Sequence, residues 1–289
     1  MREEAKILIF GDIHYSKNSL PEEKRWYPEL VSFLEFFSER WARRFLRFCD
    51  NYSQHHFKHF IEYLENINDE YDAVICLGDM TPGAMESGLI TEKARQEAVE
   101  LKEKLKSVIK SPLYFVFGNH DLGYFAPIGY KKGGASIESL HLASRIYGAK
   151  PFYSFKTDNG KFIVLSDALM ARNKGNGEMK KLKEQQFEFL KKELENNEEF
   201  FIFIHSPFAL YNKEFQNIIR ENYEKIKGIV CGHAHSSLIK HFVAPAFPFS
   251  KKLVMVPSVI GFFGFMSFTR GFTELTLGNP SYKWKHKGF

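Results

Sequence analysis

The chain has few cysteines and no long apolar segment. Its three cysteines are an odd number, Cys49, Cys76 and Cys231, and the last two fall inside predicted core strands. This argues against a disulfide framework and favours reduced packing residues in a cytosolic protein. The longest apolar stretch, residues 256–268, is broken by a proline, two serines and two glycines and is too short to cross a bilayer. We therefore expect no transmembrane segment.

We expect no secretory signal, because the first predicted strand begins within a few residues of Met1. The sequence also shows no internal repeat and no low-complexity linker. Its net charge of +5 comes from interleaved basic and acidic residues, a pattern without the basic footprint of nucleic-acid binding proteins. With 44% hydrophobic residues over 289 positions, the chain can bury a large core. We expect one cytoplasmic domain, residues 1–289, with a helical insert over about residues 15–70.

Polar motifs follow directly after five apolar runs, residues 7–10, 74–77, 114–117, 201–204 and 229–231. Such runs are typical of buried parallel strands, and open α/β sheets bind ligands at the carboxyl ends of their strands. Aspartate, asparagine and histidine from distant segments should therefore converge, as they do in a polynuclear metal site. The motifs are Asp12-Ile13-His14, Gly78-Asp79, Gly118-Asn119-His120-Asp121, His205 and Gly232-His233-Ala234-His235.

These residue types suit two divalent cations. Two ions about 3.5–4 Å apart can hold a phosphate between the attacking and leaving oxygens, and they need one bridging carboxylate. Imidazole with carboxylate suits Mn, Fe, Zn or Ni better than Ca, and we favour Mn. Alternation along a strand end should point Asp12 and His14 to one side, and likewise His233 and His235. Asp79, between these pairs, is the expected bridge.

The other elements also predict an α/β fold. Residues 89–109 and 185–194 have the spacing of surface helices, and residues 152–155 and 162–165 resemble a hairpin turned by Asp158-Asn159-Gly160. Residues 253–256 and 273–277 are expected to complete the sheets. His55, His56 and His59 lie in a polar helical stretch and His141 lies in a predicted helix, and we interpret these four as ordinary histidines rather than metal ligands.

The ordered set of motifs resembles the signature of the calcineurin-like metallophosphoesterase superfamily: D-x-H, G-D, G-N-H-D/E, H and G-H-x-H. The resemblance spans Asp12 to His235, and a single motif would occur often by chance. It implies an α/β fold in which two mixed β-sheets pack face to face, flanked by helices, with the helical insert near the active site. It also implies a metal-dependent phosphoric ester hydrolase that attacks a phosphodiester or pyrophosphate with a metal-bridging hydroxide.

The resemblance also implies a role for each motif residue. One metal would take Asp12, His14, Asp79 and His235, and the other Asp79, Asn119, His205 and His233. His120 would protonate the leaving oxygen, and Asp121 would orient or electrostatically support that imidazole.

The segment between His14 and Asp79 is longer than one crossover helix needs. Part of it carries aromatic residues at helical spacing, Trp41, Phe45, Phe48 and Tyr52, beside a basic stripe, Arg40, Arg43, Arg44 and Arg47. Three interpretations stay open: a helix packed on the body with solvated arginines, a surface that meets anionic lipid, or a cap that binds the remote part of an anionic substrate. The aromatic and basic tail at residues 282–287 also suits a membrane surface, although a terminal tail is often exposed or loosely packed.

The insert makes the chain similar to superfamily members that hydrolyse lipid-linked diphosphates, in particular UDP-2,3-diacylglucosamine hydrolases. The better-known branch of those enzymes has arginine where this chain has His120, and a second branch keeps histidine. The favoured expectation is a cytoplasmic enzyme with peripheral contact at the inner face of the membrane. A soluble phosphodiesterase acting on cyclic nucleotides or nucleic acid is the alternative. A non-catalytic scaffold is disfavoured because every ligand position is intact.

Overall fold

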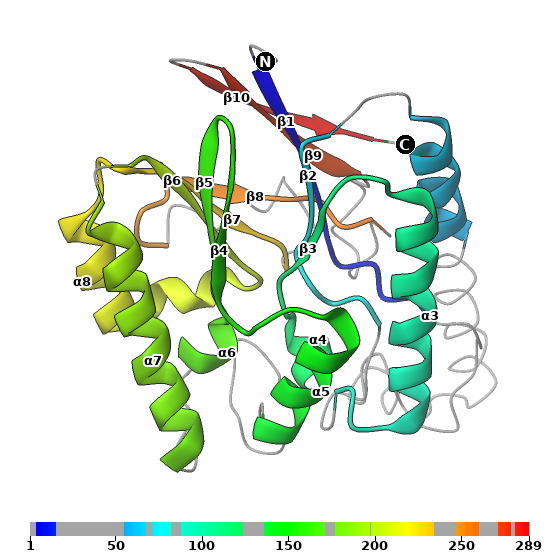
Figure 1. Cartoon of the computed structure of the whole chain (residues 1–289), viewed down its shortest axis with the longest axis horizontal. Helices are drawn as coiled ribbons and strands as arrows, with labels where there is room; N and C mark the ends of the chain where they lie inside the picture. The colour runs from blue at the N-terminus through cyan, green and yellow to red at the C-terminus, as the bar shows by residue number, and fades with distance from the viewer. Residues whose placement is uncertain are drawn as a thin grey trace, which may run out of the picture.

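Two five-stranded sheets form the centre of the structure (Figure 1), with strand orders β10-β9-β1-β2-β3 and β4-β5-β6-β7-β8. This computed structural model describes residues 4–15, 55–67, 71–81, 88–123, 136–170, 177–196, 198–233, 247–259, 271–278 and 281–288. The strands of the first sheet are β1 (Glu4–Phe10), β2 (Ala73–Cys76), β3 (Leu113–Phe115), β9 (Phe272–Gly278) and β10 (Tyr282–Lys287). Those of the second are β4 (Tyr153–Thr157), β5 (Gly160–Val164), β6 (Phe200–Ile204), β7 (Ile226–Cys231) and β8 (Leu253–Met255).

Both sheets are mixed. In the first, β1, β2 and β3 run parallel and β9 is antiparallel to β1. In the second, β5 to β8 run parallel and β4 forms the predicted hairpin with β5, with Thr157 opposite Gly160. The predicted sandwich of two mixed sheets is therefore confirmed, and the apolar runs before the motifs lie on or directly beyond parallel strands.

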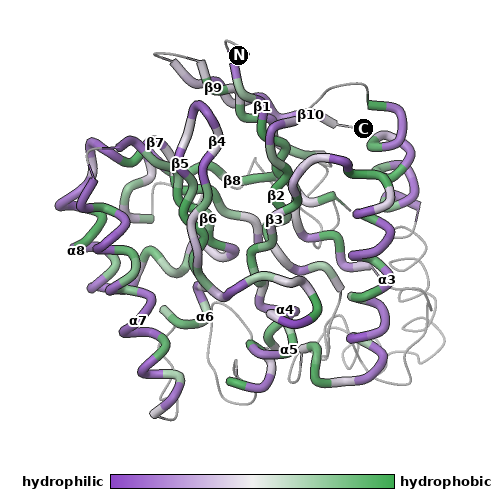
Figure 2. Tube along the Cα trace, in the orientation of Figure 1, coloured by the Kyte–Doolittle hydropathy of each residue, from purple (hydrophilic) through white to green (hydrophobic). Residues whose placement is uncertain are grey.

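The side chains of the strands divide between three apolar cores. Ile7 and Ile9 of β1 point between the sheets, where they meet Phe162 and Phe203 of the second sheet. The alternate residues of β1 point outward and pack under helices instead. Figure 2 shows the consequence in hydropathy: the central strands are largely hydrophobic, and the flanking helices alternate between hydrophilic and hydrophobic residues. Burial on both faces explains why these strands read as continuous apolar runs.

Helices cover the outer face of each sheet. The segment at residues 55–66, α3 (Glu92–Val108) and α5 (Ile137–Tyr147) pack on the first sheet, and α7 (Gly177–Leu194) and α8 (Lys213–Glu221) pack on the second. Short helices α4 (Asn119–Leu122) and α6 (Asp167–Met170) and a 3₁₀ turn (Pro207–Tyr211) complete the described elements. The predicted helix at residues 89–109 begins later, because Thr91 caps it by accepting a hydrogen bond from the amide of Ala94 at 3.4 Å.

The C-terminal segment is a strand. β10 pairs antiparallel with β9 at the edge of the first sheet, and the indole of Trp284 lies 5.6 Å from the ring of Phe201 in the second sheet. The aromatic residues at alternate positions face inward because a strand places every second side chain on the same face. The tail at residues 282–287 is therefore an edge strand whose side chains are mostly exposed, and its contact with a membrane surface stays a prediction.

The predicted insert is only partly described. Residues 55–66 are helical, with Phe57, Phe60 and Ile61 buried against the first sheet, but the arginine stripe lies outside the described residues. His56 is 5% exposed and packs within this helical segment. Among the described residues, no helix has the length and apolar character needed to cross a membrane.

Candidate metal centre

The described motif residues gather at the carboxyl ends of the parallel strands, where the two sheets lie against each other. The first sheet contributes the segments that follow β1, β2 and β3, and the second contributes those that follow β6 and β7. β2 lies between β1 and β3 of the first sheet, so Asp79 follows the strand between those that precede Asp12 and Asn119, and its role as the bridge stays a prediction. Five of the candidate residues are at most 1% exposed: Asp12, His14, Asp79, Asp121 and His205.

Left-handed backbone shapes the centre. Asp12, His14, Asp79 and His233 have φ of 51°, 46°, 51° and 62°, a conformation that is costly for residues other than glycine. β1 ends at Phe10, so these side chains stand on loops beyond the strands. The expected alternation of Asp12 and His14 along a strand is therefore wrong, although both residues still reach the centre. Such strain is typical of functional sites.

Two motif glycines let the loops cross closely. Gly78 has φ of 91°, and a Cβ there would lie 2.4 Å from the backbone nitrogen of Gly118. A Cβ on Gly118 would itself lie 2.1 Å from Oδ1 of Asp79. The glycines of the G-D and G-N-H-D motifs are therefore required by packing around the Asp79 carboxylate.

Asp79, His205 and His233 form one group that can bind a metal. His205 Nε2 lies 3.1 Å from Asp79 Oδ2 and 3.2 Å from His233 Nδ1. Asn119 adds a fourth ligand atom, because its Oδ1 lies 3.0 Å from His205 Nε2 and 2.8 Å from His233 Nδ1. These are the four residues expected around the second metal.

The hydrogen bond of His205 Nδ1 determines whether Nε2, which faces the centre, carries a proton or a lone pair. Nδ1 lies 2.6 Å from the carbonyl oxygen of Leu77, which can only accept, so Nδ1 carries a proton. In the neutral ring, Nε2 then carries a lone pair, and this lone pair faces the oxygens of Asp79 and Asn119. Either a second proton on Nε2 or a shared cation relieves this repulsion. Metal-binding histidines commonly donate their outer N–H to a backbone carbonyl in this way.

His14, Asp79 and His120 form a second group that can bind a metal. His14 Nε2 lies 3.8 Å from Asp79 Oδ2, and the rings of His14 and His120 meet edge to face with centroids 4.8 Å apart. Asp79 belongs to both groups, as a bridging carboxylate must. His120 is only half-buried and therefore lies on the solvent side of the centre.

The charges of the centre depend on one another. Burial alone would raise the pKa of Asp79, but the imidazoles of His205, His120 and His14 hold it well below the usual range. Burial would likewise lower the pKa of His205, and the carboxylates of Asp79 and Asp12 raise it well above its usual value. For Asp12, burial dominates and raises the pKa to about 7. The centre thus holds acids and imidazoles whose protons a bound cation would displace.

Asp12 is held by neighbours on both sides. Its carboxylate accepts from the backbone amide of His233, at 3.2 Å and 3.1 Å to the two oxygens. Its carbonyl oxygen accepts from Ser258 Oγ at 2.9 Å. Ser258 follows β8 and was not singled out from the sequence, where an isolated serine gives no signal.

Asp121 ties the loop after β2 to the loop after β3. Its carboxylate accepts from the backbone amides of Gly118, Asp79 and Met80 at 2.9, 3.0 and 3.3 Å. A fourth donor is the hydroxyl of Tyr147 at 2.8 Å. Asp121 therefore fixes the backbone from which Asp79 projects, and its predicted support of His120 stays a prediction.

Sequence reasoning missed two further residues near the centre. Tyr147 lies on α5 with its ring stacked on Phe115 at 5.1 Å, and only the fold brings it to Asp121. Asp167 is buried and contributes to the raised pKa of His205. It follows the strand β5, so the rule that identified the other motifs could have identified it. His235 and the arginines at 40, 43, 44 and 47 lie outside the described residues.

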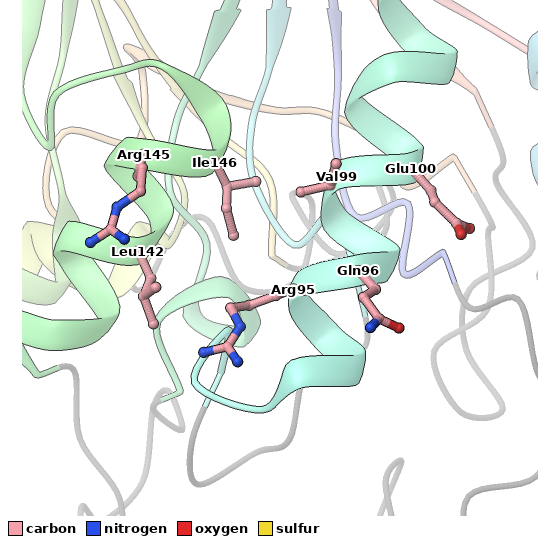
Figure 3. Close-up of a pocket in the computed structure, with 7 residues that line it drawn as sticks. All are labelled: Arg95, Gln96, Val99, Glu100, Leu142, Arg145 and Ile146. Carbon is pink, nitrogen blue, oxygen red and sulfur yellow. The ribbon is translucent and has the colours of Figure 1, made fainter.

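A separate groove of about 470 Å³ lies between α3 and α5 (Figure 3). Arg95 and Val99 of α3 face Leu142 and Arg145 of α5 across it. None of the residues that line this groove is a candidate metal ligand. The groove is therefore distinct from the candidate centre.

The sequence profile of the calcineurin-like phosphoesterases matches residues 5–237. The chain belongs to the calcineurin-like phosphoesterase family. The match covers most of the chain and includes every motif of the centre, so the protein is a metal-dependent phosphoester hydrolase with His and Asp groups that can bind metal. A search of curated proteins found no significant match.

Solved structures share the fold of this chain. A dimetal phosphatase from Danio rerio is similar, with a TM-score of 0.56 at 16% identity, covering 98% of this chain and 96% of the other. GAP50, the anchor in the inner membrane complex of Plasmodium, has a TM-score of 0.51 at 12% identity, covering 99% of this chain and 85% of the other. At such identities the likeness shows the fold alone.

Proposed function

We propose that this phosphoesterase hydrolyses a phosphodiester or pyrophosphate bond at a dinuclear centre. Asp12, His14, Asp79 and His235 would hold one cation, and Asp79, Asn119, His205 and His233 would hold the other. The observation that carries the proposal is the Asp79 carboxylate, which belongs to both metal-binding groups of the described residues. When bound, two divalent cations polarise the phosphoryl oxygens and lower the pKa of water.

The chain's own residues orient the reacting groups. The Leu77 carbonyl fixes the ring of His205, and Asp121 holds the backbone amide of Asp79. The backbone amide of His120 donates to Asp79 Oδ1 at 2.8 Å. His120 therefore holds the Asp79 carboxylate through its backbone, while its half-buried imidazole lies on the solvent side of the centre. From that position His120 donates a proton to the leaving oxygen.

Substitution of His120 tests this role. His120→Ala should keep the metals and slow hydrolysis of alkyl esters by about 10²–10⁴-fold. The loss should be much smaller with nitrophenol, a leaving group that needs little protonation. His141→Ala on the exposed face of α5 is the matched control. Because His120 also belongs to a metal-binding group, loss of metal in His120→Ala would make it a ligand and overturn its role as an acid.

For the substrate, we propose a lipid-linked nucleotide diphosphate such as UDP-2,3-diacylglucosamine. The support is the sequence pattern of Arg40, Arg43, Arg44 and Arg47 beside aromatic residues, because guanidinium groups bind phosphate in two-pronged contacts. Such an enzyme would meet the inner face of the membrane peripherally.

Replacing Arg43 and Arg47 by serine tests this choice. The double variant should raise KM for a lipid diphosphate and weaken binding to anionic vesicles, and it should hydrolyse a small chromogenic diester at the parent rate. If the double variant matched the parent in lipid-diphosphate KM, vesicle binding and small-diester turnover, the alternative substrate, a soluble phosphodiester such as a cyclic nucleotide, would be favoured. Inactivity of the metal-loaded parent toward mono-, di- and pyrophosphate esters would favour a scaffold, a role in keeping with an anchor protein of the same fold.

A further inference from the structure

Two histidines on the helical segment at residues 55–66 face each other outside the phosphoesterase centre. Nε2 of His55 and Nε2 of His59 are 3.2 Å apart, and their rings meet edge to face with centroids 4.3 Å apart. Both side chains are exposed. Residues one turn apart share a helix face, so both nitrogens point at the same region of solvent.

The separation of the two nitrogens matches a shared cation. Zinc binds imidazole nitrogen at about 2.0–2.1 Å, and two ligands at tetrahedral angles are then about 3.3 Å apart. Both histidines reach this separation without a change in the helix. Imidazole suits Zn, Ni and Cu.

A carboxylate orients the second histidine. Glu62 Oε2 lies 3.3 Å from Nδ1 of His59, where it can pair with a proton on Nδ1 and leave the lone pair of Nε2 for a cation. Carboxylate–histidine pairs around metals have this arrangement. The other oxygen of Glu62 faces Lys58 Nζ at 3.6 Å, which fixes the carboxylate from the opposite side.

We propose that His55 and His59 form a surface site for a borderline divalent cation, with Glu62 as its positioning residue and water in the remaining positions. The opposite face of this helical segment packs on the core, where the ring of Phe60 contacts Phe10 at a centroid distance of 4.9 Å. A bound cation would link His55 to His59 and so stabilise one turn of the helical segment that covers β1. The site would also add an ion to metal counts made with Zn, Ni or Cu.

Chromatography of the untagged full chain on immobilised Ni²⁺ tests the proposal, because an immobilised ion reaches exposed histidines and not the buried centre. The parent should be retained and eluted by imidazole. The variant with His55→Gln and His59→Gln should pass through, since a second, intramolecular ligand contributes roughly 10²-fold in affinity. Glu62→Gln should weaken Ni²⁺ binding by about tenfold with both ligands kept.

His141→Gln, at another exposed histidine, is the matched control and should be retained like the parent. Circular dichroism and unchanged phosphoesterase turnover establish that each variant folds. Equal retention of the parent and the double variant would overturn the proposal. A loss of retention in His141→Gln as large as in the double variant would overturn it as well.

Discussion

The contact between Tyr147 and Asp121 offers a sharp test of how the centre is positioned. Tyr147→Phe removes one hydroxyl, whose 2.8 Å hydrogen bond ends on a fully buried carboxylate. Losing a hydrogen bond to a charged group of this kind costs about 1.5–3 kcal/mol. The melting temperature should fall by roughly 2–4 °C for each kcal/mol.

The catalytic effect should follow from the three donors that remain. Backbone amides of Gly118, Asp79 and Met80 still hold Asp121, so turnover should fall by about tenfold, less than the roughly 10²-fold cost of a 1 Å displacement. Burial raises the pKa of Asp121 to about 6, and the Tyr147 hydroxyl lowers it. Removing the hydroxyl should therefore raise that pKa and move the acid limb of the kcat/KM profile to higher pH.

Tyr153→Phe is the matched control. The Tyr153 hydroxyl is also buried, but it bonds the backbone of Phe115, at 3.1 Å to the amide and 3.0 Å to the carbonyl. This variant should lose stability and keep the parent pH profile. Measurement of kcat/KM between about pH 5 and pH 9 separates the two variants. Identical profiles would refute the view that Tyr147 acts on the centre through Asp121.

Two further predictions concern the backbone and the protons of the centre. Gly118→Ala should displace the Asp79 carboxylate, which a Cβ would meet at 2.1 Å, and lower Mn²⁺ affinity in calorimetry; parent-like affinity would contradict the packing argument. Because burial raises the pKa of Asp12 to about 7, a cation must displace its proton, and Mn²⁺ affinity should rise by up to about tenfold per pH unit toward pH 7. Without metal, the stability from Asp12 is complete below its ordinary pKa of 3.8 and is lost as the pH rises through about 7. Calorimetric titration measures the Mn²⁺ affinity and thermal melts measure the metal-free stability across this pH range. A Mn²⁺ affinity that does not change with pH would contradict the prediction for Asp12.

The sequence predicted the sheets and the centre because both depend on local patterns. The apolar runs and the polar motifs after them needed only the rule that parallel strands carry their ligands at the carboxyl end. Hydrogen bonds across the fold, such as Tyr147 to Asp121, could not be predicted, since no local pattern marks a residue that meets its partner through packing of α5.

Two features of the structure were missed for physical reasons. Asp12 and His14 have left-handed backbone in the loop beyond β1, whereas a strand pattern predicts extended backbone at both residues. The tail at residues 282–287 alternates aromatic and basic residues, and that alternation has the period of a strand. Interpreting it by composition rather than by period concealed the edge strand β10, whose Trp284 packs between the sheets.

The proposed function depends on Asp79 joining two cations in one centre. Manganese content and turnover of the parent and of Asp79→Asn, measured on the same preparations, test it most directly, since Mn²⁺ binds imidazole-only surface sites weakly. We predict two manganese ions per parent chain, fewer in the variant because the cations then repel each other without the bridging charge, and near-complete loss of turnover. Full manganese content with near-normal turnover in Asp79→Asn would show that Asp79 does not bridge two cations.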